Sequence, residues 1–290
     1  MNGKMNLLQI IWNIEPEIFK IGGFSLRYYS LLFGIAFLLG YQLTAKIYRL
    51  EGQDEQQLTP LMLYIIAGTV LGARLGQTLF YEFDYFKNHP LEIILPFRYG
   101  KNGFEWTGYQ GLASHGGAIG ILAALALFCR KYKQSFLWVV DRLVIAVALG
   151  GFFIRLGNLF NSEIIGKPTT VPWAFVFQKV DALPRHPSQL YEALAYLLIF
   201  CVLGWLYRRK EVALQKGVLF GWFLVLVFAA RFMLEFTKEV QEAFEKTLPI
   251  NMGQILSLPF VVVGLYFVLR KRPRAKVVLF TPKNDTRHGA

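Results

Sequence analysis

The sequence predicts an all-α integral membrane protein with about seven transmembrane helices, the N-terminus outside, the C-terminus in the cytoplasm and a small extracytoplasmic cap. The 290 residues are 54% hydrophobic, and the mean hydropathy is +0.39. Long uncharged runs recur along the chain, whereas the alternating ten-residue segments of a membrane β-barrel are absent. Because only helices and closed barrels satisfy all backbone polar groups in lipid, we expect the runs to be helical.

Seven apolar runs are the candidate spans. In chain order they are Tyr28–Ala45, Gln56–Ala73, Trp106–Cys129, Leu143–Ile154, Ala193–Tyr207, Gly217–Ala230 and Thr247–Leu269. A helix that crosses a bilayer needs about 20 mostly apolar residues. The shorter runs therefore span the membrane only if they include flanking polar residues such as Arg155 and Arg231.

The segments around these runs predict the rest of the organisation within a single membrane domain, residues 1–290. We expect a helix lying at the membrane interface over residues 1–23, anchored by Trp12, and no cleavable signal peptide in it. The segment 162–188, which is rich in Pro and aromatic residues, is expected to form an extracytoplasmic cap with a short strand pair. Residues 270–290 are expected to be a basic cytoplasmic tail on the anionic leaflet.

The net charge of +12 indicates orientation in a membrane rather than a nucleic-acid partner. With the N-terminus outside, the cytoplasmic connections carry more Lys and Arg than the longer outer connections, as the positive-inside rule requires. The two cysteines, Cys129 and Cys201, lie in apolar runs and give neither a disulfide framework nor metal-ligand spacing. We therefore expect no metal and no cofactor.

In this orientation the unusual polar residues fall in the outer halves of the spans. Arg155 and Asn158 close the fourth run, and Arg231 and Glu235 close the sixth. An ionisable residue at mid-bilayer costs roughly 2.5–3.5 kcal/mol or more, so such residues are functional candidates. Two guanidinium groups from different helices suit a phosphate, whose oxygens they bind bidentately. We therefore expect Arg155 and Arg231 to meet in one pocket, with the phosphate of an outer-leaflet phospholipid as the counter-ion of Arg155.

Two of these features also have a purely structural interpretation. Arg231 and Glu235 are spaced i, i+4 and could form an ion pair on one helix face. In the stretch ASHGGAIG, Gly116 and Gly117 allow close approach by a neighbouring helix or by a ligand. His115 beside them could contact an anion, accept a proton or make a structural hydrogen bond.

Three stretches together resemble one family, the bacterial prolipoprotein diacylglyceryl transferases. They are SHGGAIG (114–120), RLGNLFNSEIIG (155–166) and LPRHPSQLYE (183–192), supported by NMGQILSLP (251–259). The resemblance implies transfer of the diacylglyceryl group of phosphatidylglycerol to the lipobox cysteine thiol of a preprolipoprotein. A thioether forms and glycerol phosphate leaves, the first step of lipoprotein maturation. It also implies a multi-pass protein of the bacterial inner membrane whose active site faces the extracytoplasmic side and binds the signal peptide.

The resemblance and the polar pattern together give the expected site. The expected catalytic residues are His115, Arg155, Arg231 and Tyr29, and the expected binding residues are Arg155, Asn158, Asn161, Glu163, Gly116, Gly117 and Glu235. The chain departs from the family pattern at two positions. Val227 stands where the family often has a tyrosine, and Lys238 stands where it often has an arginine.

Two other function classes use the same residues. A transporter for an anionic lipid or solute would bind it with the same arginines, but it predicts polar residues leading to the inner face and often an inverted repeat. Neither is visible in the sequence. An intramembrane protease would need Ser114 or Ser188 within hydrogen-bond distance of His115 or His186.

Overall fold

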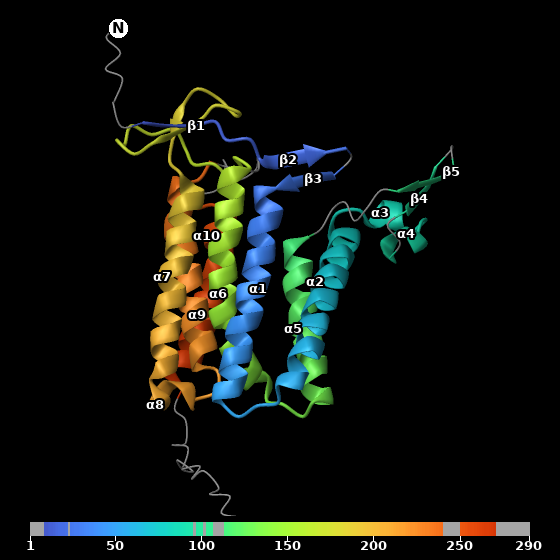
Figure 1. Cartoon of the computed structure of the whole chain (residues 1–290), viewed down its shortest axis with the longest axis vertical. Coiled ribbons are helices and arrows are strands. Elements are labelled where there is room, and N and C mark those ends of the chain that lie inside the picture. The colour runs from blue at the N-terminus through green and yellow to red at the C-terminus, as the bar shows by residue number, and fades with distance from the viewer. Residues whose placement is uncertain are drawn as a thin grey trace, which may run out of the picture.

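The computed structural model describes residues 9–22, 24–94, 97–100, 103–106, 113–239 and 250–270. Long helices run side by side, and the strands lie together at one end of the bundle (Figure 1). The long helices are α1 (Tyr28–Leu50), α2 (Leu58–Phe80), α5 (Ser114–Lys131), α6 (Phe136–Phe160), α7 (Ser188–Arg208), α9 (Val218–Leu234) and α10 (Met252–Leu269). Short helices are α3 (Phe83–Phe86), α4 (Leu91–Ile94) and α8 (Lys210–Ala213), with the 3-10 turns Glu55–Gln57 and Glu235–Thr237.

Six of the described helices, α1, α2, α6, α7, α9 and α10, are long and apolar enough to cross a membrane. Only 22% to 44% of the most apolar part of each is buried within the protein, so the rest of its surface faces outward, as lipid-exposed helices do. The chain is therefore a mostly helical, multi-pass membrane protein. The remaining expected span contains α5, whose charged and polar ends leave a shorter apolar centre. Its expected start is wrong, because Trp106 ends strand β5 (Gly103–Trp106).

The expected interfacial helix over residues 1–23 is also wrong where the chain is described. Residues 9–22 instead contribute β1 (Ile10–Trp12) and β2 (Glu17–Ile21), and β2 pairs antiparallel with β3 (Phe24–Arg27). Pro16 lacks the N–H that a helix needs, and its carbonyl accepts a hydrogen bond from Tyr28 N at 3.0 Å. Residues 1–8 lie outside the described part of the chain, as do residues 271–290 of the expected basic tail.

The connection between α6 and α7 forms the expected strand pair, and β1 completes it as a sheet. Strand β6 (Phe175–Phe177) pairs parallel with β1 and antiparallel with β7 (Pro184–Arg185). Trp12 Nε1 donates a hydrogen bond to Leu159 O at 3.1 Å, which fastens the sheet to the end of α6. A second hairpin, β4 (Phe97–Gly100) with β5, follows α3 and α4 near the end of α2 (Figure 1).

Glycine contacts join α2 to α5. A Cβ atom on Gly116 would overlap the carbonyl oxygen of Gly72, and one on Gly120 would overlap that of Gly68. Backbones this close are possible only where both helices lack side chains at the contact. The larger hydrophobic core lies toward the opposite end of the bundle from the cap, around buried residues such as Tyr48 and Leu203.

A buried ionic cluster closes that opposite end. Arg142 in α6 donates to the Glu51 carboxylate at 2.8 and 2.9 Å, and Trp138 Nε1 donates to the same group at 2.8 Å. Asp141 accepts hydrogen bonds from the N–H groups of Gly217 and Phe220, so it caps α9 from a neighbouring helix. These contacts fix α9 against α6, and the candidate site described below lies beside the other end of both helices.

Candidate functional site

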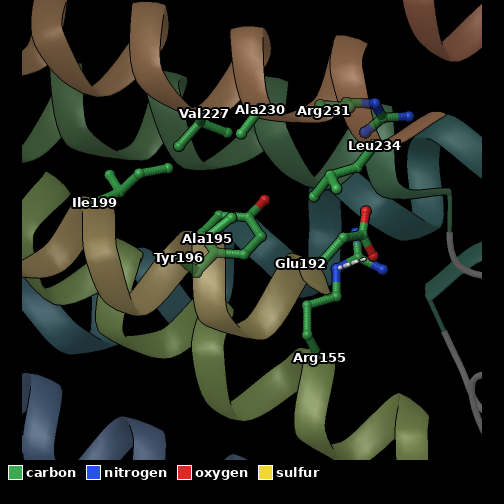
Figure 2. A pocket seen from close by; sticks show the side chains of 9 residues that line it. All are labelled: Arg155, Glu192, Ala195, Tyr196, Ile199, Val227, Ala230, Arg231 and Leu234. Atoms are coloured by element: carbon green, nitrogen blue, oxygen red, sulfur yellow. Dashed lines mark ion pairs between the residues drawn. The ribbon is translucent and has the colours of Figure 1, made fainter. Parts of the chain in front are cut away.

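A pocket lies beside α6, α7 and α9 near the end of the bundle that carries the cap (Figure 2). About 270 Å³ of space not filled by protein atoms lies there, including space that is open to the surroundings. Its lining consists of Arg155, Glu192, Ala195, Tyr196, Ile199, Val227, Ala230, Arg231 and Leu234. The two arginines that the sequence places on separate helices therefore line one pocket. Figure 2 shows both guanidinium groups extending toward the same end of it.

Arg155 already has a protein counter-ion. Its Nε lies 3.1 Å from Glu192 Oε2, and its Nη1 donates to Asn158 Oδ1 at 3.4 Å. The Glu192 carboxylate is thus a counter-ion of Arg155 that the sequence analysis did not expect, and the lipid phosphate as a counter-ion stays a prediction. A bound phosphate would share the guanidinium with Glu192 or replace it.

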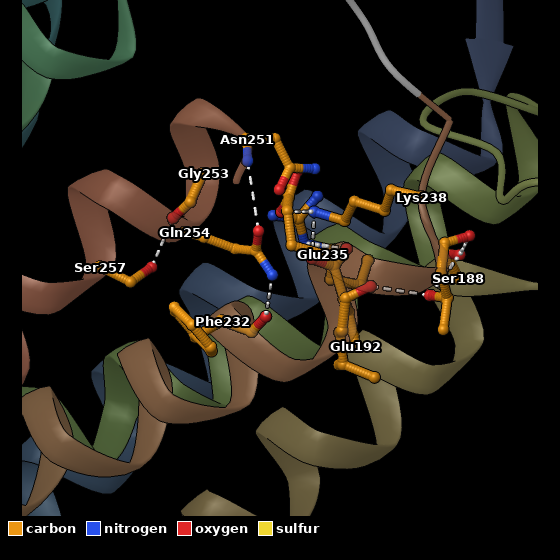
Figure 3. A network of polar contacts seen from close by, with 12 residues as sticks. Ser188, Glu192, Phe232, Glu235, Lys238, Asn251, Gly253, Gln254 and Ser257 are labelled. Carbon is orange, nitrogen blue, oxygen red and sulfur yellow. Dashed lines mark hydrogen bonds and ion pairs between the residues drawn. The ribbon is translucent and has the colours of Figure 1, made fainter. Parts of the chain in front are cut away.

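Glu192 belongs to a longer chain of alternating charges. Lys238 Nζ lies 2.7 Å from Glu192 Oε1 and 3.2 Å from Glu235 Oε2 (Figure 3). Glu192 and Lys238 are only 4% and 5% exposed, so each charge depends on its neighbours for solvation. Lys238, which departs from the family pattern, therefore joins α7 to the end of α9 through two ion pairs.

The start of α10 is shaped to receive Glu235. A Cβ atom on Gly253 would lie 2.6 Å from Glu235 Cδ, so only glycine leaves room for the carboxylate. Asn251 and Gln254 form a capping box there, and Gln254 Nε2 donates to Phe232 O at 3.3 Å (Figure 3). The N-terminal end of a helix carries partial positive charge, which favours a carboxylate at this position.

Arg231 differs from Arg155. Among the described residues it forms no ion pair and no hydrogen bond, and its side chain is exposed. Glu235 pairs with Lys238, so the structural Arg231–Glu235 pair that the spacing allowed is not formed. The ionisable groups that line the pocket, two arginines and one glutamate, therefore leave one positive charge in excess.

Asn158, Asn161 and Glu163 support the site from the loop that follows α6. Asn158 Nδ2 and Asn161 Nδ2 donate to the two oxygens of Glu163 at 3.2 and 3.1 Å. Ser162 and Ile164 have φ angles of 54° and 55°, in the left-handed region that non-glycine residues seldom adopt. These three expected binding residues do not line the pocket; they hold the loop and, through Asn158, the guanidinium of Arg155.

The other expected site residues lie outside the pocket lining. Tyr29 packs on Gly157 of α6, where a Cβ atom would come within 2.6 Å of its ring. His115 is exposed on the first turn of α5. Gly116 and Gly117 both face α2, the first against Gly72 and the second in ordinary contact with Ala73. Both glycines pack against α2 and neither lines the pocket, so their role in lipid binding stays a prediction.

The expected catalytic and binding residues did not include Glu192 or Tyr196. Both line the pocket from α7, and Glu192 is the contact that joins Arg155 to Lys238. Their spacing of four residues places them on one helix face, so an ionisable residue and a phenol on the same face of an apolar helix were the available signal.

Two of the residues considered for a protease, Ser188 and His186, bond to other side chains. Ser188 Oγ lies 3.0 Å from Thr237 Oγ1, and His186 Nδ1 lies 3.3 Å from the Tyr191 hydroxyl. Burial lowers the pKa of His186, which keeps its ring neutral at pH 7. Among the described side chains, the Ser188 hydroxyl forms no hydrogen bond with a histidine ring.

Helices that can span a membrane, a buried charge chain and a pocket with excess positive charge define a multi-pass membrane protein with a cationic pocket between its helices. The family model described as prolipoprotein diacylglyceryl transferase matches residues 16–270. The chain belongs to that family and is a transferase.

Similar proteins from several bacteria carry the name phosphatidylglycerol–prolipoprotein diacylglyceryl transferase. The relative from Bacteroides fragilis is 48% identical over 263 residues, which cover 90% of this chain and 95% of the relative. The relative from Tolumonas auensis is 49% identical over 261 residues, covering 90% and 96%. The relative from Chloroherpeton thalassium is 45% identical over 269 residues, covering 92% and 96%.

Proposed function

We propose that this protein transfers the diacylglyceryl group of phosphatidylglycerol to the lipobox cysteine thiol of preprolipoproteins, the first step of lipoprotein maturation. The names of its relatives specify this lipid and this class of acceptor. The observation that carries the proposal for this chain is that Arg155 and Arg231 face one pocket, which holds a positive charge in excess. Such a pair of guanidinium groups binds a phosphate from two sides.

The remaining lining suits the rest of a phospholipid. Away from the arginines the pocket is bounded by apolar side chains such as Ile199 and Val227. An acyl chain or glycerol backbone fits against these, while the phosphate stays at the charged end. A transporter would instead need polar groups leading toward the opposite end of the bundle, and beyond Tyr196 the residues that line the pocket are apolar.

The reaction exchanges one bond for another at a glycerol carbon. The cysteine sulfur attacks that carbon, the bond from the carbon to the phosphate oxygen breaks, and its electron pair leaves with glycerol phosphate. Negative charge builds on the departing phosphate, and Arg155 and Arg231 stabilise it by electrostatic attraction. The product is a thioether, and the thiol proton passes to a base or to solvent.

The thiol must lose its proton before it attacks. A free cysteine has a pKa of roughly 8.5, and the positive field of the two arginines lowers it. His115 lies at the same end of the bundle, exposed on α5. In our proposal it accepts the proton from the signal-peptide cysteine before the sulfur enters the pocket, and the arginines then hold the thiolate.

We also propose the placement in the membrane. The six long apolar helices and α5 together make seven spans of the bacterial inner membrane, with the N-terminus outside and the C-terminus in the cytoplasm. The cap and the pocket then face the extracytoplasmic side, where exported preprolipoproteins arrive. The charge asymmetry of the connecting segments supports this orientation.

Substitution of the two arginines tests the proposal. In vesicles containing labelled phosphatidylglycerol and a lipobox peptide, Arg155→Gln and Arg231→Gln should each lower transfer about 100-fold or more, since one oxyanion-stabilising donor is worth 2.7–4 kcal/mol. Arg208→Gln, at the exposed opposite end of α7, is the matched control and should keep full activity.

Thermal unfolding of the same variants distinguishes a loss of catalysis from a loss of folded protein. Arg231→Gln should unfold at the wild-type temperature, because Arg231 has no partner among the described residues. A well-folded Arg231→Gln enzyme with wild-type activity would refute the proposal. A peptide with serine in place of cysteine should accept no lipid.

A further inference from the structure

Tyr196 presents a hydroxyl group to the pocket that the mechanism above does not use. It lies on α7 four residues after Glu192 and lines the same pocket. Figure 2 shows the hydroxyl directed toward α9, where the facing pocket residues, Val227 and Ala230, are apolar. Among the described residues, this hydroxyl has no hydrogen-bond partner.

The direction of the ring is fixed by α6. A Cβ atom on Gly151 would lie 2.7 Å from Tyr196 Cδ1 and 2.9 Å from Cε1, so the ring rests directly on the backbone of α6 at a glycine. With the ring held there, the hydroxyl extends from α7 into the pocket. Its orientation follows from packing and does not require a ligand.

A tyrosine hydroxyl in this position is expected to form a hydrogen bond when the pocket is occupied. Tyr196 is half-buried, and its hydroxyl is open to the pocket rather than enclosed by protein atoms. A tyrosine packed against apolar side chains usually finds a hydrogen-bond partner for its polar end. Water is scarce at this level of a membrane-spanning bundle. The partner is therefore a group of the molecule that enters the pocket.

The depth of Tyr196 along α7 indicates which group of the lipid is its hydrogen-bond partner. Four helical residues advance about 6 Å, so Tyr196 lies one turn deeper along α7 than Glu192 and the guanidinium of Arg155. In a phospholipid, the acyl ester groups follow the phosphate toward the bilayer centre. Their carbonyl oxygens only accept hydrogen bonds, which suits a phenol that donates.

We propose that the Tyr196 hydroxyl donates a hydrogen bond to an acyl ester carbonyl of the lipid whose phosphate is held by Arg155 and Arg231. This inference rests on the proposed function. It makes Tyr196 a substrate-binding residue that sets how deep the lipid sits, and so helps to place the reacting glycerol carbon below the phosphate. The pocket then has three levels: guanidinium groups, a single phenol, and apolar side chains such as Ile199.

The Tyr196→Phe variant tests this contact because it removes the hydroxyl and keeps the ring on Gly151. A net hydrogen bond contributes 0.5–1.5 kcal/mol, so the KM for phosphatidylglycerol, as mole fraction in mixed micelles, should rise about 2- to 10-fold with little change in kcat. Tyr266→Phe is the matched control, because Tyr266 is 63% exposed on α10, and it should leave KM unchanged.

An ether-linked phosphatidylglycerol, which lacks the ester carbonyls but keeps the reacting carbon, identifies the acceptor. With this donor, wild type and Tyr196→Phe should have equal KM values. The thermal shift that each lipid produces gives a readout independent of turnover: the ester lipid should stabilise wild type more than Tyr196→Phe, and the ether lipid should stabilise both equally.

Two results would overturn the inference. One is an unchanged KM in Tyr196→Phe with the ester lipid; the other is a loss equally large with both lipids, which would mean that the hydroxyl serves the fold. Either result leaves the proposed function intact as long as wild type transfers lipid. Absence of transfer by wild type would count against the proposed function itself.

Discussion

Glu192 shows how single charged residues are kept in an apolar bundle. Its two carboxylate oxygens lie within ion-pair distance of Arg155 and Lys238, and Lys238 also contacts Glu235. Removing one member of such a buried set leaves its neighbours without solvation, which costs more than the intact interaction contributes. The chain therefore holds Arg155 in place before any lipid arrives, and among the described residues it leaves Arg231 without a counter-ion.

A residue-level prediction concerns the cap. Arg185 is 8% exposed and donates to the Asp181 carboxylate at 3.0 and 3.1 Å from its Nε. These hydrogen bonds lower the pKa of Asp181 below its ordinary value. A carboxyl whose folded-state pKa is depressed stabilises the fold fully above its unfolded-state pKa of about 3.9. That stabilisation is lost as the pH falls through the lower folded-state value.

Asp181→Asn should therefore lower the unfolding temperature at pH 7, and the difference from wild type should shrink as the pH falls below about 4. Thermal unfolding between pH 7 and pH 3 measures this. A difference that stays constant over the whole range would show that the charge of Asp181 is not what stabilises the cap.

At the level of elements, the contact of α2 with α5 depends on which glycine faces the neighbouring helix. Gly116 and Gly117 are adjacent in the sequence, yet a Cβ on Gly116 would overlap Gly72 O while one on Gly117 would meet Ala73 Cβ at 3.6 Å. Gly116→Ala should therefore destabilise the protein by about 1–3 kcal/mol, the usual cost of overpacking. Gly117→Ala should be neutral or stabilise by about 0.5–1 kcal/mol, since alanine favours helix over glycine.

Unfolding in detergent measures this pair of variants, and Gly117→Ala serves as the control for changes in helix propensity. Equal stability of the two variants would mean that α2 and α5 are not packed at these glycines. The comparison also bears on His115, which is carried on the same turn of α5.

The elements were predictable to different degrees. The long helices lie where the apolar runs are, because a bilayer span needs a continuous apolar surface. The prediction of a helix in the N-terminal segment is wrong. Its apolar residues suit a helix, but Pro16 and pairing with distant residues favour strands. Strand β1 pairs with β6, more than 160 residues later in the chain, and no local pattern specifies a partner that remote.

At the level of the whole molecule, all described strands lie at one end of the bundle (Figure 1). The two arginines of the pocket lie toward the same end, because Arg155 is near the end of α6 and Arg231 near the end of α9. The proposed orientation places that end outside.

In a chain with Cys129→Ala and Cys201→Ala, a membrane-impermeant maleimide should label Thr170→Cys in intact spheroplasts. It should label Gln215→Cys, at the other end, only after permeabilisation. Both positions are exposed, so access depends on the side of the membrane. The reverse labelling pattern would contradict the orientation and the outward-facing site.

The sequence by itself determined that this protein is a multi-pass helical membrane protein of the diacylglyceryl transferase family, since apolar length and local motifs are properties of contiguous residues. It also indicated that Arg155 and Arg231 lie at the same end of different helices. Only the tertiary structure decided that Glu192 neutralises Arg155, that Arg231 has no counter-ion among the described residues, and that Gly116 packs against α2. These outcomes depend on which side chains from α6, α7 and α9 meet across the pocket. The rotation and packing of the helices determine those contacts, and the order of residues along one helix does not specify them.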